Sequence, residues 1–214
     1  MGQRAALLRI RAVTGRSAAG RAEPTTKRRL GREERRAAIV DGAAVAFARG
    51  GYAASSMADI AAAAGVSHLI IYRHFESKEA LYETVLERAL DSLSEALAPD
   101  TAVGVYGPTP SVLLSTARAD SAGFESLFRH ASREPDFQRW SELAWKLLAD
   151  LTESALASNV ARSHLRWAAR ATVVYIVEAV LVWVEDGDPL LDARFVAATN
   201  AALRAGVKSW ARSS

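Results

Sequence analysis

The stretch SMADIAAAAGVSHLIIYRHFESKEAL, residues 56–81, decides the fold of this chain. Ser56 and Asp59 stand three residues apart, which is the spacing of a capping box at the start of a short helix. Gly65 allows a sharp turn after that helix, and Ser67 is placed to cap the free amides of the next one. Two short helices joined by a tight turn that contains glycine indicate a helix-turn-helix.

Helical spacing continues on both sides of this stretch. From Arg32 to Phe47 apolar residues recur every three or four positions, and we expect Gly50-Gly51 to end this first helix. Ser77 is placed to cap a fourth, long helix that runs to about Ala98. The sequence therefore predicts a helix-turn-helix domain at residues 31–90, with a linking helix that continues to about residue 98.

The remainder of the chain predicts a second helical domain at residues 105–214. Residues 99–110 contain three of the six prolines, which indicates a linker. Helical patterns follow at about residues 110–119, 121–132, 136–158, 160–186 and 190–211, and we find no strand-like alternation of useful length. The predicted fold class is therefore all-α.

The composition is that of an ordinary globular protein. Of 214 residues, 50% are hydrophobic and 24% are charged. There is no cysteine, which excludes disulfides and thiolate metal sites and fits a cytoplasmic location. The longest apolar run, residues 171–184, contains Glu178 and is shorter than the roughly 20 residues that a membrane helix needs. We therefore expect no membrane association.

Positive charge is concentrated at the N-terminus. Residues 1–36 carry eleven arginines and lysines against three glutamates, a net charge of +8, whereas the whole chain has +3. We interpret residues 1–30 as a basic flexible arm on a mildly acidic body, which suggests contact with a polyanion at one end. A solvated tail without function is the alternative, and the composition of residues 1–22 also resembles that of a transit peptide.

The second short helix of the motif carries polar side chains that packing does not explain. Ile71 and Phe75 are spaced to face the core, which leaves Tyr72, Arg73 and His74 outside, where they would supply donors to phosphates and base edges of a duplex. Lys78 stands in the first turn of the fourth helix, where the helix dipole disfavours a cation. It is either a solvated lysine or a contact to a DNA phosphate.

Three signatures in residues 56–81 closely resemble the DNA-binding domain of TetR-family repressors. They are SMADIA at 56–61, AGVS at 64–67 and IYRHFESKEAL at 71–81, in the family's order and spacing. The resemblance implies a homodimer, a palindromic operator, a C-terminal effector-binding domain, and release of the operator when a small molecule binds.

The same resemblance places individual residues on DNA. It implies phosphate contacts at Ser56, Ser67, Tyr72, His74 and Lys78. It implies base readout near His68, Leu69, Ile70 and Arg73. His68, Leu69 and Ile70 depart from the residues common there in the family, and the apolar pair would suit thymine methyl groups.

Aromatic residues accumulate in the second half of the chain. They favour a bulky, largely apolar effector, although such stripes also form ordinary cores. Glu178, alone in an apolar helix, needs an arginine partner, solvent or a cationic ligand, and His130 is interpreted as a surface residue. The residues selected as candidate ligand contacts are Phe124, Phe128, Trp140, Trp145, Tyr175 and Glu178.

The last two predicted helices have the character of a dimer interface. Residues 171–184 are apolar almost all round, and the final helix offers small residues such as Ala198, Ala202 and Ala205 for close approach. Two helices from each subunit would form a four-helix bundle through about residues 160–211.

Three functional classes follow from these patterns. The first is a ligand-gated repressor, and the second is a constitutive or architectural DNA-binding regulator whose C-terminal half only dimerises. The third, an enzyme, has no support, because the sequence contains no nucleophile elbow, phosphate-binding glycine loop or metal-ligand cluster. We therefore expect no catalytic residue, no cofactor and no metal site.

Overall fold

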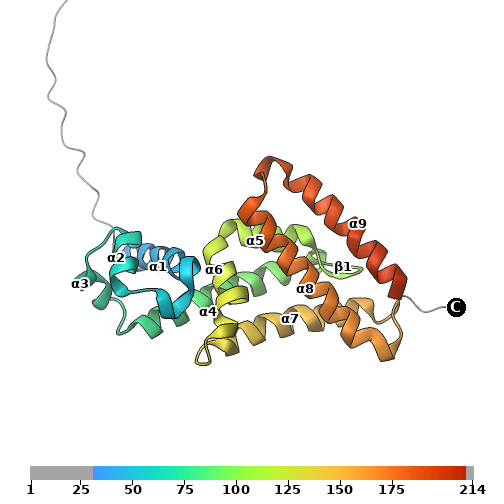
Figure 1. The fold of residues 1–214 in the computed structure, drawn as a ribbon, viewed down its shortest axis with the longest axis horizontal. Helices are drawn as coiled ribbons and strands as arrows, with labels where there is room; N and C mark the ends of the chain where they lie inside the picture. Colours follow the sequence, from blue (N-terminus) through green and yellow to red (C-terminus); the bar gives the residue numbers. More distant parts are fainter. Residues whose placement is uncertain (1–30, 211–214) are drawn as a thin grey trace, which may run out of the picture. The chain divides into compact units, whose positions relative to one another are not determined.

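The computed structural model describes residues 31–210 (Figure 1). The predicted basic arm at residues 1–30 lies outside the described residues, as do residues 211–214. The described part is helical nearly throughout, which confirms the all-α prediction.

Four helices form the N-terminal part: α1 (Arg32–Ala54), α2 (Met57–Ala64), α3 (His68–Tyr72) and α4 (Lys78–Leu97). The predicted capping box at α2 is confirmed, because Ser56 Oγ accepts from the Asp59 amide and the Asp59 carboxylate accepts from the Ser56 amide. Gly65 adopts the left-handed conformation at the turn, with a φ of 63°. Ser77 caps α4, whereas Ser67 precedes α3 without a side-chain capping bond, so that predicted cap is wrong.

The end of α1 differs from the prediction by one turn. Gly51 has a φ of 80°, as expected of a glycine that interrupts a helix, but helical structure resumes and continues to Ala54. Gly42 explains how closely α1 and α2 pack, since a Cβ atom there would lie 2.5 Å from the backbone of Ala64.

The second part begins with a hairpin in the segment predicted to be a linker. A short 3₁₀ turn (η1, Asp100–Ala102) leads into strands β1 (Val103–Gly104) and β2 (Gly107–Pro108), which pair antiparallel. Gly107 has a φ of 104°, and a Cβ atom there would lie 2.4 Å from Thr152 Oγ1, so the hairpin presses directly against α7. Strands this short leave no alternating pattern, which is why the sequence did not reveal them.

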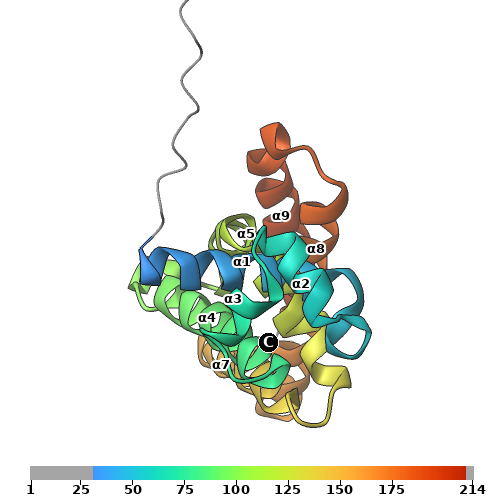
Figure 2. The same cartoon turned by 90° about the vertical axis from the view of Figure 1, so that its left-hand side faces the viewer.

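The helices of the second part lie close to their predicted positions. They are α5 (Pro110–Ala119), α6 (Ser121–Glu125), the π-helical turn η2 (Ser126–His130), the 3₁₀ turn η3 (Ala131–Arg133), α7 (Gln138–Leu156), α8 (Arg162–Asp186), the 3₁₀ turn η4 (Pro189–Leu191) and α9 (Asp192–Trp210). Figure 1 shows α8 and α9 as neighbouring long helices, and Figure 2 looks onto the end formed by α2 and α3.

One hydrophobic core joins the two parts. It contains buried side chains of α1, α4, α5, α6, α7 and α8, so the predicted domains at 31–90 and 105–214 share their interior. At the centre of the join, the Tyr82 ring of α4 lies 4.6 Å from Phe47, 5.3 Å from Tyr52 and 4.8 Å from Phe137, measured between ring centroids. Phe137 directly precedes α7, so this aromatic cluster ties α1 and α4 to the second part.

α8 is longer than the apolar run at residues 171–184, which by itself is too short to span a membrane. Among residues 31–210 it is the one helix long and apolar enough to cross a membrane by length and composition. Its buried face, which includes Val173, Ile176, Val177 and Val180, packs in the core, and core helices of soluble proteins pass the same test.

A hydrogen bond at the start of α4 makes the stability of the fold depend on pH. The Tyr52 hydroxyl donates to the Glu79 carboxylate, and this bond lowers the pKa of Glu79 from 4.5 to about 2. Because the folded-state pKa is depressed, the bond stabilises the fold above about pH 4.5, and that contribution is lost as the pH falls towards 2. Tyr52→Phe should therefore cost more stability at neutral pH than at pH 3, as measured by urea unfolding at each pH.

Tyr82→Phe is the matched control for this prediction. The Tyr82 hydroxyl is buried and has no hydrogen-bond partner within residues 31–210. Its removal should change the free energy of unfolding by the same amount at both pH values. A Tyr52→Phe effect that is equally flat would contradict the role given to Glu79.

Candidate nucleic-acid interface

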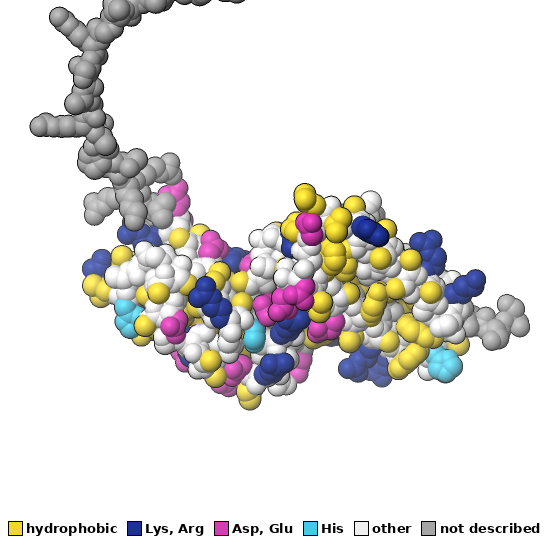
Figure 3. Space-filling model, turned by 45° about the horizontal axis from the view of Figure 1, so that its top comes forward, with side chains coloured by type: hydrophobic (Ala, Val, Ile, Leu, Met, Phe, Trp, Pro, Cys, Tyr) yellow, Lys and Arg dark blue, Asp and Glu magenta, His cyan; other side chains and the backbone are white. Residues whose placement is uncertain are grey.

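α3 presents most of its predicted contact residues to solvent. Leu69 is 64% exposed and Tyr72 is 50% exposed, while His68 and Arg73 are also exposed. The His68 ring meets the edge of the Tyr72 ring at 4.9 Å between centroids. In Figure 3 the end of the protein that carries α3 shows positive, histidine and hydrophobic side chains together.

The remaining α3 positions are less accessible. Ile71 is fully buried, as predicted, whereas Ile70 is half-buried and packs against the core. His74 is also half-buried. The structure therefore brings Leu69, Tyr72 and Arg73 together on an open surface, and leaves Ile70 only partly available to a duplex.

The two predicted serine contacts differ in their hydrogen bonding. Ser56 Oγ donates to Asp59 Oδ2 at 2.6 Å, and the bonds from Ser56 hold the pKa of the Asp59 carboxyl below its usual range. Ser67 is exposed and makes no capping bond, so its hydroxyl is the freer donor for a phosphate. Both contacts remain predictions.

Lys78 has partners that sequence reasoning missed. Its Nζ atom donates to the carbonyl oxygens of Tyr52 at 2.9 Å and Ser55 at 3.0 Å, and lies 4.0 Å from the Tyr52 ring centroid. These carbonyls end α1, where the helix dipole favours a cation, so the alternative of a simple solvated lysine is wrong. An ammonium has three N–H donors, and the phosphate contact remains a prediction for the third.

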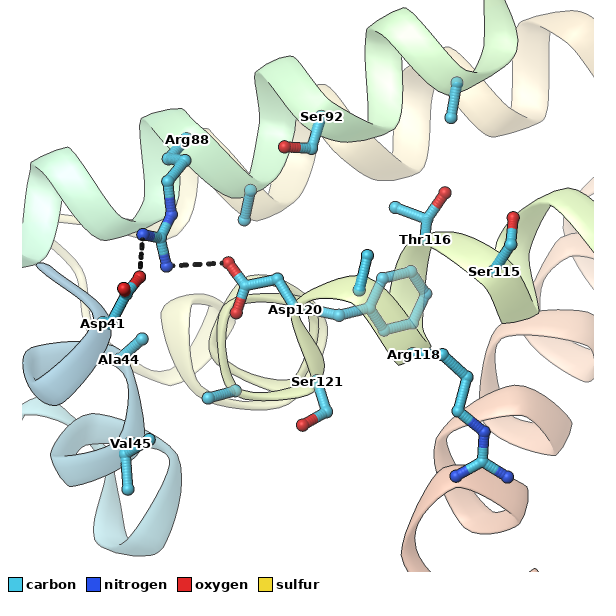
Figure 4. A pocket seen from close by; sticks show the side chains of 15 residues that line it. Asp41, Ala44, Val45, Arg88, Ser92, Ser115, Thr116, Arg118, Asp120 and Ser121 are labelled. Atoms are coloured by element: carbon cyan, nitrogen blue, oxygen red, sulfur yellow. Dashed lines mark hydrogen bonds and ion pairs between the residues drawn. The ribbon is translucent and has the colours of Figure 1, made fainter. Parts of the chain in front are cut away.

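An arginine on α4 connects the helix-turn-helix part to α6. Arg88 Nη1 lies 2.5 Å from Asp41 Oδ1 of α1, and Nη2 lies 2.9 Å from Asp120 Oδ2, just before α6 (Figure 4). Asp120 Oδ1 also accepts from the Gly123 amide at 2.8 Å, which fixes this carboxylate at the start of the helix. These groups line a pocket of about 680 Å³ between α1, α4, α5 and α6.

The segment at residues 130–139 makes a second connection. His130 Nε2 donates to the Ala48 carbonyl at 3.0 Å, and the Glu134 carboxylate accepts from the Ala53 amide at 3.3 Å. Arg139 pairs with Glu83 of α4 at 2.6 Å. The prediction that His130 is a surface residue is wrong, because the tertiary contact that half-buries it leaves no local sequence signal.

The six candidate ligand residues are not brought to one place. Phe124 and Phe128 are buried, with tilted rings 4.7 Å apart between centroids, and Phe128 meets Trp145 edge to face at 5.1 Å. Trp145 lines a cavity of about 500 Å³ between α7 and α8. Trp140 packs against the core outside that cavity, and its indole Nε1 is buried without a partner in the described part of the chain.

The other two candidates lie on the outer face of α8. Tyr175 is 43% exposed and borders a shallow apolar groove together with Glu178. Glu178 pairs with Arg129 at 3.8 Å, which confirms the arginine partner expected for a carboxylate on this helix. Arg129 also contacts Glu125 and Glu185, so it balances several carboxylates at once.

Comparisons with known proteins agree with this architecture. The sequence model described as "Bacterial regulatory proteins, tetR family" matches residues 39–85, which cover most of α1, then α2, α3 and the start of α4. The chain is 46% identical over 65 residues to the HTH-type transcriptional activator FasR of Mycolicibacterium smegmatis, covering 30% of each protein. It is 41% identical over 63 residues to the HTH-type transcriptional repressor KstR2 of Rhodococcus jostii, covering 29% of this chain and 31% of that one.

The sequence likeness is confined to one part, whereas the fold likeness is wider. The chain spans about a third of the length of these curated relatives. A TetR family transcriptional regulator from Chloroflexus aurantiacus superposes with a TM-score of 0.66 at 16% identity, over 86% of this chain and 96% of that one. At that identity the match shows the fold alone.

The matching family model and both of these relatives are named as regulatory proteins, and the match lies in their DNA-binding motif. The helix-turn-helix part of this chain, residues 39–85, therefore matches the TetR family of bacterial regulatory proteins, and the described residues share the fold of solved TetR family regulators.

Proposed function

We propose that this chain is a sequence-specific DNA-binding transcriptional repressor that a small molecule releases from its operator. The observation that carries the proposal is the exposed surface of α3, where Leu69, Tyr72 and Arg73 stand free of the core within a helix-turn-helix of TetR type. Arg73 supplies donors to base edges, Tyr72 supplies a hydroxyl to a phosphate, and Leu69 offers apolar contact to a thymine methyl group.

The unpartnered face of α8 supports the proposal that the regulator is a homodimer. Trp167, Val174, Tyr175 and Val182 are all between 43% and 56% exposed, and their spacing places them along one stripe of the helix. α9 adds exposed small residues at Ala198, Ala201, Ala202 and Ala205. A contiguous apolar surface with small residues beside it suits close packing against the same helices of a second subunit.

A dimer of this kind explains why the operator should be palindromic. Two recognition helices related by a two-fold axis read two half-sites one helical turn apart, or a multiple of it. A change in their separation would spoil the fit to a site of fixed spacing. The two connections from the sensor helices to α1 and α4, through Arg88 and through residues 130–139, are the contacts by which an effector would change that separation.

Substitutions on α3 test the DNA-binding assignment. Arg73→Ala should lower operator affinity by about 1–3 kcal/mol and relax base preference, while Tyr72→Ala should weaken all sequences alike. Binding should be measured by fluorescence anisotropy on an operator selected from a random DNA pool, at several salt concentrations. Arg162→Ala, an exposed arginine at the start of α8, is the charge-matched control. Equal affinity of the parent chain for operator and scrambled duplex would refute the proposal.

A charged residue in the small-residue face of α9 tests the dimer. Ala202→Arg should push the packed helices apart and yield monomers in analytical ultracentrifugation, with native helical content. Ala98→Arg introduces the same charge at an exposed position after α4 and should leave the dimer intact. If Ala202→Arg stays dimeric with unchanged stability, the interface lies elsewhere.

Effector control is tested by titration of the operator complex. A bulky, largely apolar compound that binds the sensor helices should weaken operator binding by about 5–150-fold, the usual range of allosteric coupling. Linkage requires that the operator weaken binding of the same compound by the same factor, which calorimetry of the free and DNA-bound protein can check. Compounds that bind without any change in operator affinity would favour the constitutive regulator instead.

A further inference from the structure

The cavity between α7 and α8 has the size and walls of a small-molecule site. Its volume of about 500 Å³ lies within the range of known ligand pockets. Trp145 and Ala149 of α7 and Val173 and Val174 of α8 form its apolar walls. The Phe128 ring packs against the Trp145 indole in a T-shaped contact, with 5.1 Å between the ring centroids.

One buried polar group of this cavity lacks a partner. Ser141 is 1% exposed and lines the cavity, and its hydroxyl makes no hydrogen bond to any part of residues 31–210. A buried hydroxyl without a partner is destabilising, so such groups are rare unless a water or a ligand satisfies them. Ser141 therefore marks a point where an occupant would accept or share a hydrogen bond.

One positively charged side chain in the cavity lining has no ion-pair partner within residues 31–210. Lys146 pairs with Asp150 at 2.7 Å, whereas Glu142 accepts from the neutral Gln138 amide at 2.8 Å and keeps its negative charge. Arg170 of α8 also lines the cavity, is exposed, and has no ion pair or hydrogen bond within the described range. A guanidinium at the mouth of an apolar pocket suits a carboxylate, which it binds with two parallel hydrogen bonds.

We propose that this cavity binds an amphipathic organic anion, an aromatic or branched carboxylate. Arg170 holds the carboxylate, the Ser141 hydroxyl donates to a ligand oxygen, and the Trp145 indole covers the apolar body. The inference rests on the proposed function in one respect, because it identifies this anion as the effector that weakens operator binding.

The position of the cavity links its occupant to the DNA-binding part. Ser132 and Gln138 line the cavity as well, and both belong to the segment that contacts α1 and α4. Between them, Glu134 accepts from the Ala53 amide and Phe137 packs 4.7 Å from the Tyr52 ring. A ligand that draws this segment towards α8 therefore displaces the contacts that hold the end of α1.

Three probes with one ring system separate charge from apolar contact. They are naphthalene carboxylate, the neutral naphthalene carboxamide and naphthylmethylammonium, each titrated into the full-length protein by calorimetry. We expect the carboxylate to bind at least about tenfold more tightly than the other two, because a charge-assisted hydrogen bond is worth roughly twice a neutral one. Comparable affinity for carboxylate and carboxamide, or no binding of the carboxylate, would overturn the proposal.

Two variants assign the contacts. Arg170→Gln should weaken the carboxylate by about ten- to a hundredfold and leave the carboxamide unchanged, whereas Arg162→Gln, on the same helix but outside the cavity, should change neither. Ser141→Ala should weaken the carboxylate without lowering the Tm of the free protein, since it removes an unsatisfied hydroxyl. Carboxylate binding that is unchanged in Arg170→Gln, or a Ser141→Ala effect seen only as lost stability, would refute the assignment.

Operator binding by the parent chain, measured with no probe present, keeps this test separate from the proposed function. An operator complex that forms normally while the carboxylate does not bind would overturn the anion site alone. Binding of the carboxylate without any loss of operator affinity would overturn its role as effector. A parent chain that does not distinguish operator from scrambled duplex would instead overturn the proposed function.

Discussion

The attachment at the end of α1 is the interaction on which the rest of the structure depends. Gly51 interrupts the helix, and Lys78 donates to the carbonyl oxygens of Tyr52 and Ser55 at its end. The same lysine lies over the Tyr52 ring, whose hydroxyl donates to Glu79 at the start of α4. A small set of side chains thereby fixes α1 against α4, and the α2–α3 motif is held between these two helices.

This attachment also explains why the helix-turn-helix and the sensor helices share one core. Tyr52 and Tyr82 both contact Phe137, which stands just before α7, so the aromatic cluster that closes the N-terminal part is completed by the second part. Without Phe137, the Tyr82 ring would lose one of its packing partners. The two parts are therefore interdependent in stability, which is what transmission of a signal between them requires.

The sequence predicted the elements of this protein better than it predicted their contacts. Caps at Ser56 and Ser77, the turn at Gly65 and the apolar spacing of the long helices are local signals, and the structure confirms them. The partners of Lys78 and of His130 were not predicted, because they lie 23–26 and 82 residues away in the chain, where no local pattern reaches. The same limit applies to the proposed anion site, since Ser141 and Arg170 line one cavity only through the packing of α7 on α8.

The two connections from the sensor helices reach α1 at points that define how it can move. Asp41, which pairs with Arg88, and Ala48, whose carbonyl accepts from His130, are seven residues apart, which is about two helical turns or roughly 10 Å. They therefore lie on the same face of α1. Asp41 is held by Arg88 of α4, which also pairs with Asp120 at the start of α6, and Ala48 is held from the segment before α7. A ligand that shifts only the second connection leaves Asp41 as a pivot. α1 then has to rotate rather than translate, and because α2 packs closely against Gly42 near that pivot, the rotation is carried to α3. In the proposed dimer, a small displacement near Ser132 and Gln138 would in this way be converted into a change of angle at α3, and a fixed half-site spacing would make that angle decisive.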